Sequence, residues 1–387
     1  MQQLFTRTVW LLGLVSLFTD MASEMLYPVM PLYLKSIGFS VIGIGILEGL
    51  AEATAGLSKG YFGKLSDLRA RRAPFVQWGY LLSALSKPLM AVWTAPLWVL
   101  GARTTDRLGK GIRTGARDAM LSAEATPATR ARVFGFHRAM DTLGAAIGPF
   151  LALLFLWRFP EHYRTLFLLA FAPGLAAVVV TLLLKDRPAA PAPGREKAGF
   201  LSFLRYIPQS SQGYRRLLIG LLAFALVNSS DIFLLLMLKY KGVSDMALIG
   251  FYIFYNLIYA LAALPAGSLG DRWGLKPTFV TGLLIFALVY GGMAVAGQWW
   301  QFGLLFLLYG LYAALTEGIA KAWISHLAEQ RDMATAIGAY EGLRSITTLL
   351  ASTLAGIIWY QFSPNALFGL TAILVMGIVL YFVKWAE

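Results

Sequence analysis

Charged residues gather in one long stretch of the chain, from Trp98 to Leu121. Its cations recur three or four positions apart, as Arg103, Arg107, Lys110, Arg113 and Arg117. On a helix this spacing places them along one face. A charge at bilayer depth costs about 2.5 to 3.5 kcal/mol, so such a face must meet protein or a water-filled cavity. We therefore interpret the stretch as a functional helix whose basic face attracts anions.

Carboxylates at similar depth can neutralise this face and carry protons. They lie in pairs four residues apart or among the cations, and we predict proton coupling at Asp20, Glu24, Glu48, Glu52 and Asp106. The members of each pair share a helix face. A carboxylate that is ion-paired when the site is empty, and protonated when substrate takes its cation, would exchange proton for substrate.

The predicted substrate site adds polar side chains from the second half of the chain. We assign substrate binding to Arg103, Arg107, Lys110, Glu24, Asn228, Asp231, Tyr252 and Asn256. A cavity lined by cations concentrates anions, so the expected substrate carries anionic groups. In an alternative interpretation, charges within the protein neutralise the cations, and the carboxylates bind a cationic drug.

Composition places these residues in a membrane. The chain has 387 residues, 58% of them hydrophobic, and its apolar runs of about 20 residues are long enough to span a bilayer. It has no cysteine and three histidines, so we expect no metal site and no cofactor. No nucleotide-binding loop and no pairing of a nucleophile with a general base stands out in the sequence. We therefore expect that the protein is not an enzyme. The net charge of +13 lies mostly in alternate loops, which indicates cytoplasmic loops rather than nucleic-acid binding.

The apolar runs predict an all-α membrane protein with twelve transmembrane helices, because helices satisfy their own backbone groups in lipid. The expected limits are 8–34, 41–62, 75–95, 97–121, 133–156, 165–185, 215–238, 247–268, 277–297, 301–325, 335–360 and 365–384. A solvated linker, 186–213, separates two six-helix bundles, 1–185 and 214–387. We expect a monomer in a bacterial inner membrane, with both termini cytoplasmic.

The two bundles are related by sequence. A shift of 204 positions pairs Lys35 with Lys239, Gly38 with Gly242, Gly63 with Gly267 and Asp67 with Asp271, and a shift of 203 pairs Gly115 with Gly318 and Gly135 with Gly338. These matches cluster at the ends of the spans. Pseudo-symmetric halves with a site at their interface are what alternating-access carriers need.

Two equivalent loops carry the most specific motif. They read GKLSDLRARR, from Gly63 to Arg72, and GSLGDRWGLK, from Gly267 to Lys276. A glycine allows a tight helix end, and cations can hold the carboxylate in one conformer. The loops resemble the GxLaDrxGrr signature of the major facilitator superfamily, which implies a breakable charge network on the cytoplasmic side. In the first copy Leu68 and Ala70 depart from the signature.

Three shorter elements resemble those of twelve-span drug:proton antiporters in this superfamily. They are PVMP at 28–31, GAAIGP at 144–149, and the Arg103, Asp106, Gly109 and Gly111 set, in which Arg107 replaces a glycine. The resemblance implies that Arg103 is tied to proton transfer. The paired glycines expected after the second element are replaced by Ala152 and Leu153.

A predicted gate collects the motif residues and the charges near the cytoplasmic ends of the spans. It consists of Gly63, Asp67, Arg71, Arg72, Asp118, Arg138, Asp141, Gly267, Asp271, Arg272, Lys321, Glu341 and Arg344. In the repeat register Asp118 falls opposite Lys321, Arg138 opposite Glu341, and Asp141 opposite Arg344. The reversal of charge predicts pairing across the pseudo-twofold axis.

Together these features predict a secondary transporter that moves a small organic solute, with an anionic solute expected, by proton-coupled alternating access. Export by antiport is the favoured direction. The alternatives are a proton-coupled uptake symporter for an organic anion or chelate, and an exporter of cationic drugs that uses the acidic cluster. The expected partners are the solute, protons and the lipid bilayer.

Overall fold

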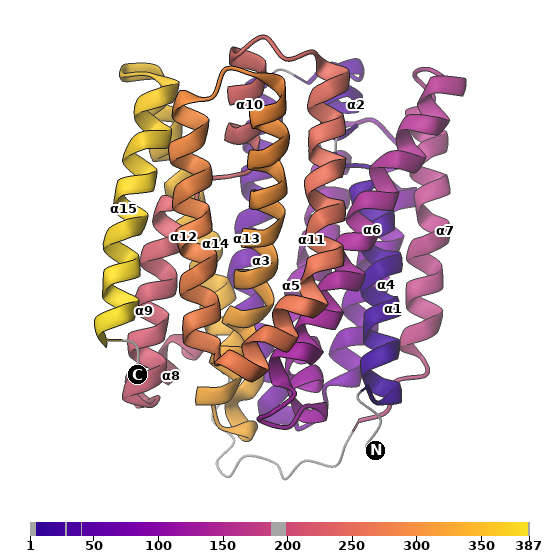
Figure 1. Ribbon diagram of the computed structural model, residues 1–387. Coiled ribbons are helices and arrows are strands. Elements are labelled where there is room, and N and C mark those ends of the chain that lie inside the picture. Colours follow the sequence, from indigo (N-terminus) through magenta and orange to yellow (C-terminus); the bar gives the residue numbers. More distant parts are fainter. Residues whose placement is uncertain (1–4, 28, 40, 187–198, 386–387) are drawn as a thin grey trace. The chain divides into compact units, whose positions relative to one another are not determined.

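The computed structural model describes residues 5–27, 29–39, 41–186 and 199–385. In these residues the chain forms helices and turns and no strand (Figure 1). Within the described residues, eight helical segments are long and apolar enough to cross a membrane, one of them, Gln212–Tyr240, being interrupted. The protein is a multi-pass membrane protein. The helix that carries the basic face is not one of the eight, since its charges lower its hydropathy.

The chain divides into two compact units. Unit 1 comprises Met1–Thr126, Met140–Gln209 and Ala328–Ser345, and unit 2 comprises Pro127–Ala139, Ser210–Leu327 and Ile346–Glu387. Each unit therefore includes a short segment from the other half of the sequence. The predicted division into 1–185 and 214–387 stays a prediction, and 187–198 of the predicted linker lie outside the described residues.

Unit 1 is built from the helices of the first half. They are α1 (Arg7–Glu24), α2 (Met30–Ser36), α3 (Val41–Arg69), α4 (Ala73–Val92), α5 (Pro96–Glu124), most of α6 (Arg130–Arg158), α7 (Tyr163–Thr181), the 3-10 turn η1 (Ser202–Arg205) and α8 (Tyr206–Gln209). The turn η2 (Gln330–Asp332) and the first part of α14 (Met333–Gln361) complete it. Helix α5 packs against α3 and α4, while α7 packs against α1 and α4.

Unit 2 repeats this pattern of neighbours. It contains α9 (Gln212–Val227), α10 (Ile232–Tyr240), α11 (Asp245–Trp273), α12 (Leu275–Val295), α13 (Trp299–Leu327), the remainder of α14 and α15 (Pro364–Trp385), together with the start of α6. Helix α13 packs against α11 and α12, and α15 packs against α9 and α12. Figure 1 shows α12 and α15 side by side. The same neighbours recur in both units, as the internal repeat predicted.

Two predicted spans, 8–34 and 215–238, each contain a break in the helix that we did not predict from the sequence. The second still forms one segment, Gln212–Tyr240, that is long and apolar enough to cross a membrane. The first ends as α1 at Glu24 and resumes as α2 at Met30, and the second ends as α9 at Val227 and resumes as α10 at Ile232. The first break overlaps the start of the PVMP element, whose prolines lack a backbone N–H. The second contains Asn, Ser, Ser and Asp at 228–231, short polar side chains that compete for backbone hydrogen bonds.

The short helices α2 and α10 end in the same way. Gly38 has a φ of 94° and Gly242 a φ of 85°, a left-handed conformation that glycine adopts without steric cost. The following N–H groups close equivalent turns, from Phe39 to the Leu34 carbonyl and from Val243 to the Leu238 carbonyl. Because the two glycines are 204 positions apart, the structure repeats the break and its ending in both halves.

Candidate functional site

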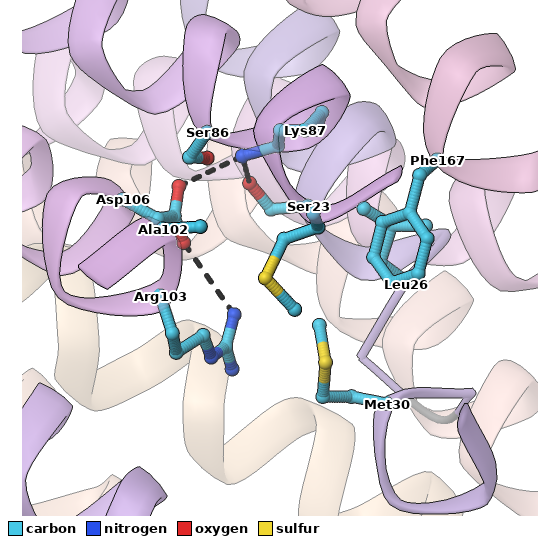
Figure 2. A pocket seen from close by; sticks show the side chains of 10 residues that line it. Ser23, Leu26, Met30, Ser86, Lys87, Ala102, Arg103, Asp106 and Phe167 are labelled. Atoms are coloured by element: carbon cyan, nitrogen blue, oxygen red, sulfur yellow. Dashed lines mark hydrogen bonds and ion pairs between the residues drawn. The ribbon is translucent and has the colours of Figure 1, made fainter. Parts of the chain in front are cut away.

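A buried ion-pair cluster lies inside unit 1, and we call it the α5 pocket. It is a small, partly open space lined by Ser23, Leu26, Met30, Ser86, Lys87, Met90, Ala102, Arg103, Asp106 and Phe167. Figure 2 shows the charged groups of Lys87, Arg103 and Asp106 pointing toward one another at one side of this space. The apolar side chains of Leu26, Met30 and Phe167 line the other side.

One carboxylate in the α5 pocket is held by two cations. Asp106 lies 2.7 Å from Lys87 Nζ and 3.5 Å from Arg103 Nη1. Lys87 also donates to the Ser23 hydroxyl at 3.2 Å. Lys87 is 3% exposed and Arg103 is 8% exposed, so the pairs lie away from bulk solvent. The pocket therefore already accommodates a carboxylate between two cationic side chains, which is the arrangement that an anionic substrate would need.

Local sequence explains how the pocket is positioned. Asp106 and Arg103 are one turn apart on α5 and therefore share a face. Lys87 comes from α4, which packs closely on α5 because a side chain at Gly79 or Gly109 would meet the backbone of the other helix. The Ser83 hydroxyl, one turn before Lys87, donates to the Asp106 carbonyl at 3.1 Å. The two helices are thus held in register at the ion pairs.

The remaining cations of the predicted basic face have different environments. Arg113 is buried, with its guanidinium 4.3 Å from the Tyr80 ring centre and bonded to Ser83. Arg117 is buried and pairs with Asp118 at 2.8 Å. Arg107 is partly buried and Lys110 is exposed. The basic face is therefore not uniformly open to solvent, because Arg113 and Arg117 pack inside the protein.

Carboxylates of α1 and α6 form a second charged group in unit 1. Asp20 lies within hydrogen-bond reach of Asp141, which also accepts a hydrogen bond from the Ser16 hydroxyl. Glu24 is partly buried, and the charges of Lys110 and Arg107 act on it. Asp20 and Glu24 are thus close to cations of the basic face. Glu48 and Glu52 lie on α3, but their side chains are outside the described part of the structure.

The polar residues predicted in the second half form a cluster in unit 2. Asp231, in the break between α9 and α10, accepts hydrogen bonds from Tyr255 at 2.9 Å and Tyr309 at 2.5 Å. Asn228 donates to the Tyr312 hydroxyl at 3.0 Å. Tyr252 packs against Tyr255 with ring centres 5.4 Å apart, and the buried Asn256 donates to the Tyr252 carbonyl. We had not singled out Tyr309 or Tyr312 from the sequence.

The first motif loop forms a contact that we call the first latch. Asp67 lies beyond the predicted span 41–62 and pairs with Arg72 at 3.2 Å. It also accepts hydrogen bonds from the Thr335 N–H at 2.7 Å and the Thr335 hydroxyl at 2.9 Å. These contacts place the carboxylate at the N-terminus of α14, where the helix dipole favours negative charge. Burial raises the pKa of Asp67 to about 6, although Arg72 and Thr335 oppose the shift.

The second latch has the same design in unit 2. Asp271 accepts hydrogen bonds from the backbone N–H groups of Ala131 at 2.9 Å and Arg132 at 3.1 Å, at the start of α6. The Arg132 side chain pairs with it at 2.9 Å. Arg71 and Arg272, which we had assigned to the gate, are both exposed. The cation paired with Asp271 thus comes from α6, which the motif alone did not indicate.

Glycine is required at each latch by a close backbone approach. A Cβ atom at Gly63 would collide with the Ala334 carbonyl oxygen, and one at Gly267 would collide with the Ala131 carbonyl oxygen. These two contacts are equivalent in the internal repeat. Both motif glycines therefore let the start of α14 or α6 reach the motif aspartate.

The other predicted gate charges have defined partners within the units. In unit 2, Arg138 bonds to Glu317 and to the Tyr259 hydroxyl. In unit 1, Glu341 pairs with Lys59 at 3.3 Å. Lys321 and Arg344 are partly buried. The pairing across the pseudo-twofold axis stays a prediction, and sequence reasoning did not identify Lys59 as a partner.

Comparison with known proteins identifies the family. The model of the Major Facilitator Superfamily matches residues 12–256 and 242–386, which together cover most of the chain. The chain belongs to this superfamily. Major facilitator superfamily proteins are transporters, not enzymes, and they bind small-molecule substrates.

Sequence similarity to known relatives extends over nearly the whole chain. An uncharacterized MFS-type transporter of Methanocaldococcus jannaschii is 32% identical, over 98% of this chain and 95% of its own length. A multi-drug resistance efflux pump of Lactococcus lactis, a PmrA homolog, is 23% identical over 98% of this chain and 95% of its own length. The staphyloferrin B transporter of Staphylococcus aureus is 24% identical over 96% of this chain and 89% of its own length.

Solved structures of the superfamily share the fold. The human organic anion transporter MFSD10 superposes with a TM-score of 0.82 at 16% identity, over 97% of this chain and 99% of that one. The E. coli fucose:proton symporter FucP superposes with a TM-score of 0.77 at 11% identity, over 97% of each chain. The predicted all-α membrane fold and the superfamily resemblance are thereby confirmed.

Proposed function

We propose that this major facilitator superfamily transporter moves a small organic anion by proton-coupled alternating access, with export by antiport as its direction. The observation that carries the proposal is the α5 pocket, where Lys87 and Arg103 hold the Asp106 carboxylate between them. The pocket contributes two positive charges and one negative charge, so it favours an added anion. A substrate carboxylate can take the place of Asp106 on one of the two cations.

Proton coupling is supported by the carboxylates that lie near these cations. Asp106 is ionised while Lys87 and Arg103 hold it, and it can accept a proton once substrate displaces it. Asp20 and Asp141 lie within hydrogen-bond reach of each other, and two carboxylates in such a position can share one proton. In this scheme Arg107 and Lys110 attract the anionic substrate toward the pocket, and Glu24 takes part in binding it. Asp20, Glu24, Glu48 and Glu52 serve proton transfer.

In this proposal the two latches close one side of the transporter during part of the transport cycle and open during the rest of it. They would be cytoplasmic, in a monomer that resides in a bacterial inner membrane with both termini inside. The positive residues of the adjoining loops support this orientation through the positive-inside rule. Asp118, Arg138, Asp141, Lys321, Glu341 and Arg344 are assigned to the same gate.

Two alternatives rest on specific observations. Uptake of an organic anion or chelate by symport would use the same α5 pocket with opposite proton direction, and the relative named for staphyloferrin B is a transporter of a specific solute. Export of cationic drugs would use Asp20, Glu24 and the other carboxylates. The relative named as a multi-drug resistance efflux pump supports export in general.

The test is proton movement in proteoliposomes that contain a pH-sensitive dye. Organic anions and lipophilic cations are applied to wild-type protein, Lys87→Met, Arg107→Ala and the control Arg158→Ala, whose side chain is exposed at the end of α6. We expect anion-dependent proton flux that the first two substitutions reduce at least tenfold and the control leaves unchanged. The sign of the flux separates antiport from symport. Flux that responds to cations and survives Lys87→Met and Arg107→Ala would contradict an anion site in the pocket.

A further inference from the structure

The break between α9 and α10 in unit 2, together with α12, contains buried oxygen atoms that the proposed anion site does not use. Ser229 is 5% exposed and Tyr290 is 0% exposed, and neither hydroxyl makes a hydrogen bond of good geometry in the described structure, although the two lie within reach of each other. The side-chain carbonyl oxygen of Asn228 is also buried without a hydrogen bond. Buried polar atoms of this kind are rare in folded proteins, because each costs about 1 to 3 kcal/mol when it has no partner.

These atoms gather beside a carboxylate. Asn228, Ser229 and Asp231 lie within four consecutive positions of the break. The Tyr290 hydroxyl lies close to Ser229 and within electrostatic reach of Asp231. Tyr255 and Tyr309 donate to Asp231 and so fix the direction of its carboxylate. The cluster thus combines one anionic oxygen group with three neutral oxygens on α12 and the helix break.

The internal repeat shows how this cluster differs from the α5 pocket. At the shift of 203 positions, Lys87 of the α5 pocket corresponds to Tyr290, and Asp106 corresponds to Tyr309. The cation and carboxylate of unit 1 are thus both replaced by tyrosines in unit 2. A carboxylate, Asp231, is present there instead, contributed by the helix break. The two equivalent places therefore offer opposite chemistry, with paired cations in one unit and clustered oxygens in the other.

We propose that Asp231, Ser229, Tyr290 and Asn228 form a binding site for a small monovalent cation, either Na⁺ or a primary ammonium group. Hard cations and ammonium groups both take oxygen ligands, and a carboxylate supplies the opposite charge. The end of α9 adds to this preference, because the C-terminus of a helix is its negative pole. Broken membrane helices use such ends to hold cations.

This inference goes beyond the proposed function, because it adds a cation to a transporter of anions coupled to protons. It does not depend on the α5 pocket. Na⁺ at this site would act as a second coupling ion. A primary ammonium group would belong to the substrate, which would then carry both signs of charge.

The test measures cation binding directly, so that it is independent of transport. Purified full-length protein in detergent is unfolded thermally in NaCl, methylammonium chloride or choline chloride at equal ionic strength. Choline is the reference because its quaternary nitrogen has no N–H group and is bulky. We expect Na⁺ or methylammonium to raise the unfolding temperature relative to choline, in a saturable way.

The site is assigned by variants that each remove one oxygen. Ser229→Ala and Tyr290→Phe are expected to weaken the apparent affinity for the active cation at least about tenfold, and Ser229→Thr, which keeps the hydroxyl, to retain it. The matched controls Tyr381→Phe and Ser268→Ala remove hydroxyls of unit 2 that bond to backbone carbonyls of Arg216 and Leu264, and should leave it unchanged.

Each outcome decides the proposal. Stabilisation by Na⁺ alone assigns a coupling ion, and stabilisation by methylammonium assigns an ammonium subsite. Equal unfolding temperatures of wild-type protein in all three salts would overturn the proposal. A cation effect that persists unchanged in Ser229→Ala and Tyr290→Phe would overturn it as well. Neither result would affect anion-dependent proton flux, so failure here is distinct from failure of the anion proposal.

Discussion

The carboxylate of Asp67 accepts a hydrogen bond from the backbone N–H of Thr335, at 2.7 Å and across 268 positions of sequence. Its repeat equivalent, Asp271, accepts one at 3.1 Å from the backbone N–H of Arg132, which is the repeat equivalent of Thr335 at the shift of 203 positions. Each motif aspartate thus holds the first turn of a helix encoded in the other half of the chain. A signature that looks local in sequence therefore acts on distant residues in both units.

The first prediction concerns the close approach at Gly63. Gly63→Ala places a methyl group against the Ala334 carbonyl oxygen, and overpacking of this kind costs about 1 to 3 kcal/mol. We expect the first latch to weaken and transport in proteoliposomes to fall about fivefold or more. Gly101→Ala is the matched control, because a side chain at Gly101 meets open space. If the Gly63→Ala variant transported at the wild-type rate, the close approach at this position would not be needed for transport.

The second prediction concerns pH and follows from the raised pKa of Asp67, about 6. A carboxyl whose pKa is higher in the folded protein than in the unfolded chain stabilises the fold below its unfolded pKa. That contribution is lost as the pH rises through about 6. Wild-type protein should therefore lose stability relative to Asp67→Asn between about pH 4 and pH 7. Thermal unfolding of both proteins across this range measures the difference, and parallel curves would contradict the buried, protonatable Asp67.

The third prediction concerns the ion pairs of the α5 pocket. Breaking a buried pair by removing one partner costs about 3 to 5 kcal/mol. Asp106→Asn leaves two buried cations without their carboxylate, whereas Lys87→Met leaves Asp106 with Arg103 alone. We expect Asp106→Asn and Lys87→Met each to lower the free energy of unfolding. The double variant should be less destabilised than the sum of the two, because it removes both charges. Additive losses in chemical unfolding would mean that the two side chains do not interact.

The fourth prediction concerns the partner of Arg138. The structure pairs it with Glu317, whereas the charge pattern of the repeat predicts pairing with Glu341. If the contact to Glu317 matters for transport, Arg138→Glu should reduce transport and the added Glu317→Arg should restore part of it. Recovery with Glu341→Arg in place of Glu317→Arg would instead support pairing across the pseudo-twofold axis. The Lys59→Glu and Glu341→Lys exchange is the corresponding test in unit 1.

Much of the architecture could be predicted from hydropathy and repetition. Apolar runs located the long helices, and the spacing of Asp67 and Asp271 identified equivalent loops before their contacts were known. The breaks after Glu24 and after Val227 were not predicted, because a hydropathy window averages polarity and ignores which backbone groups find partners. A proline-rich or Asn-Ser-Ser-Asp segment inside an apolar run was the available signal.

The candidate site could be predicted only in part, for a different reason. Spacing on α5 placed Arg103 and Asp106 on one face, but the choice of Lys87 as their partner depends on how α4 rotates and packs. The same holds for Tyr309 with Asp231 and for Lys59 with Glu341. Spacing within one helix can be read from sequence, whereas contacts between helices depend on close packing that one sequence does not reveal.

The composition of unit 1 has a consequence for biosynthesis. Its first latch joins Asp67 to Thr335, which is translated 268 residues later. At about 5 to 20 residues per second, this delay is on the order of tens of seconds. During that time Asp67 and the glycine at 63 are present in the nascent chain without the helix that they hold. A ribosome that stops before codon 335 would release a first half that lacks its latch, and quality-control proteases could recognise that exposed surface.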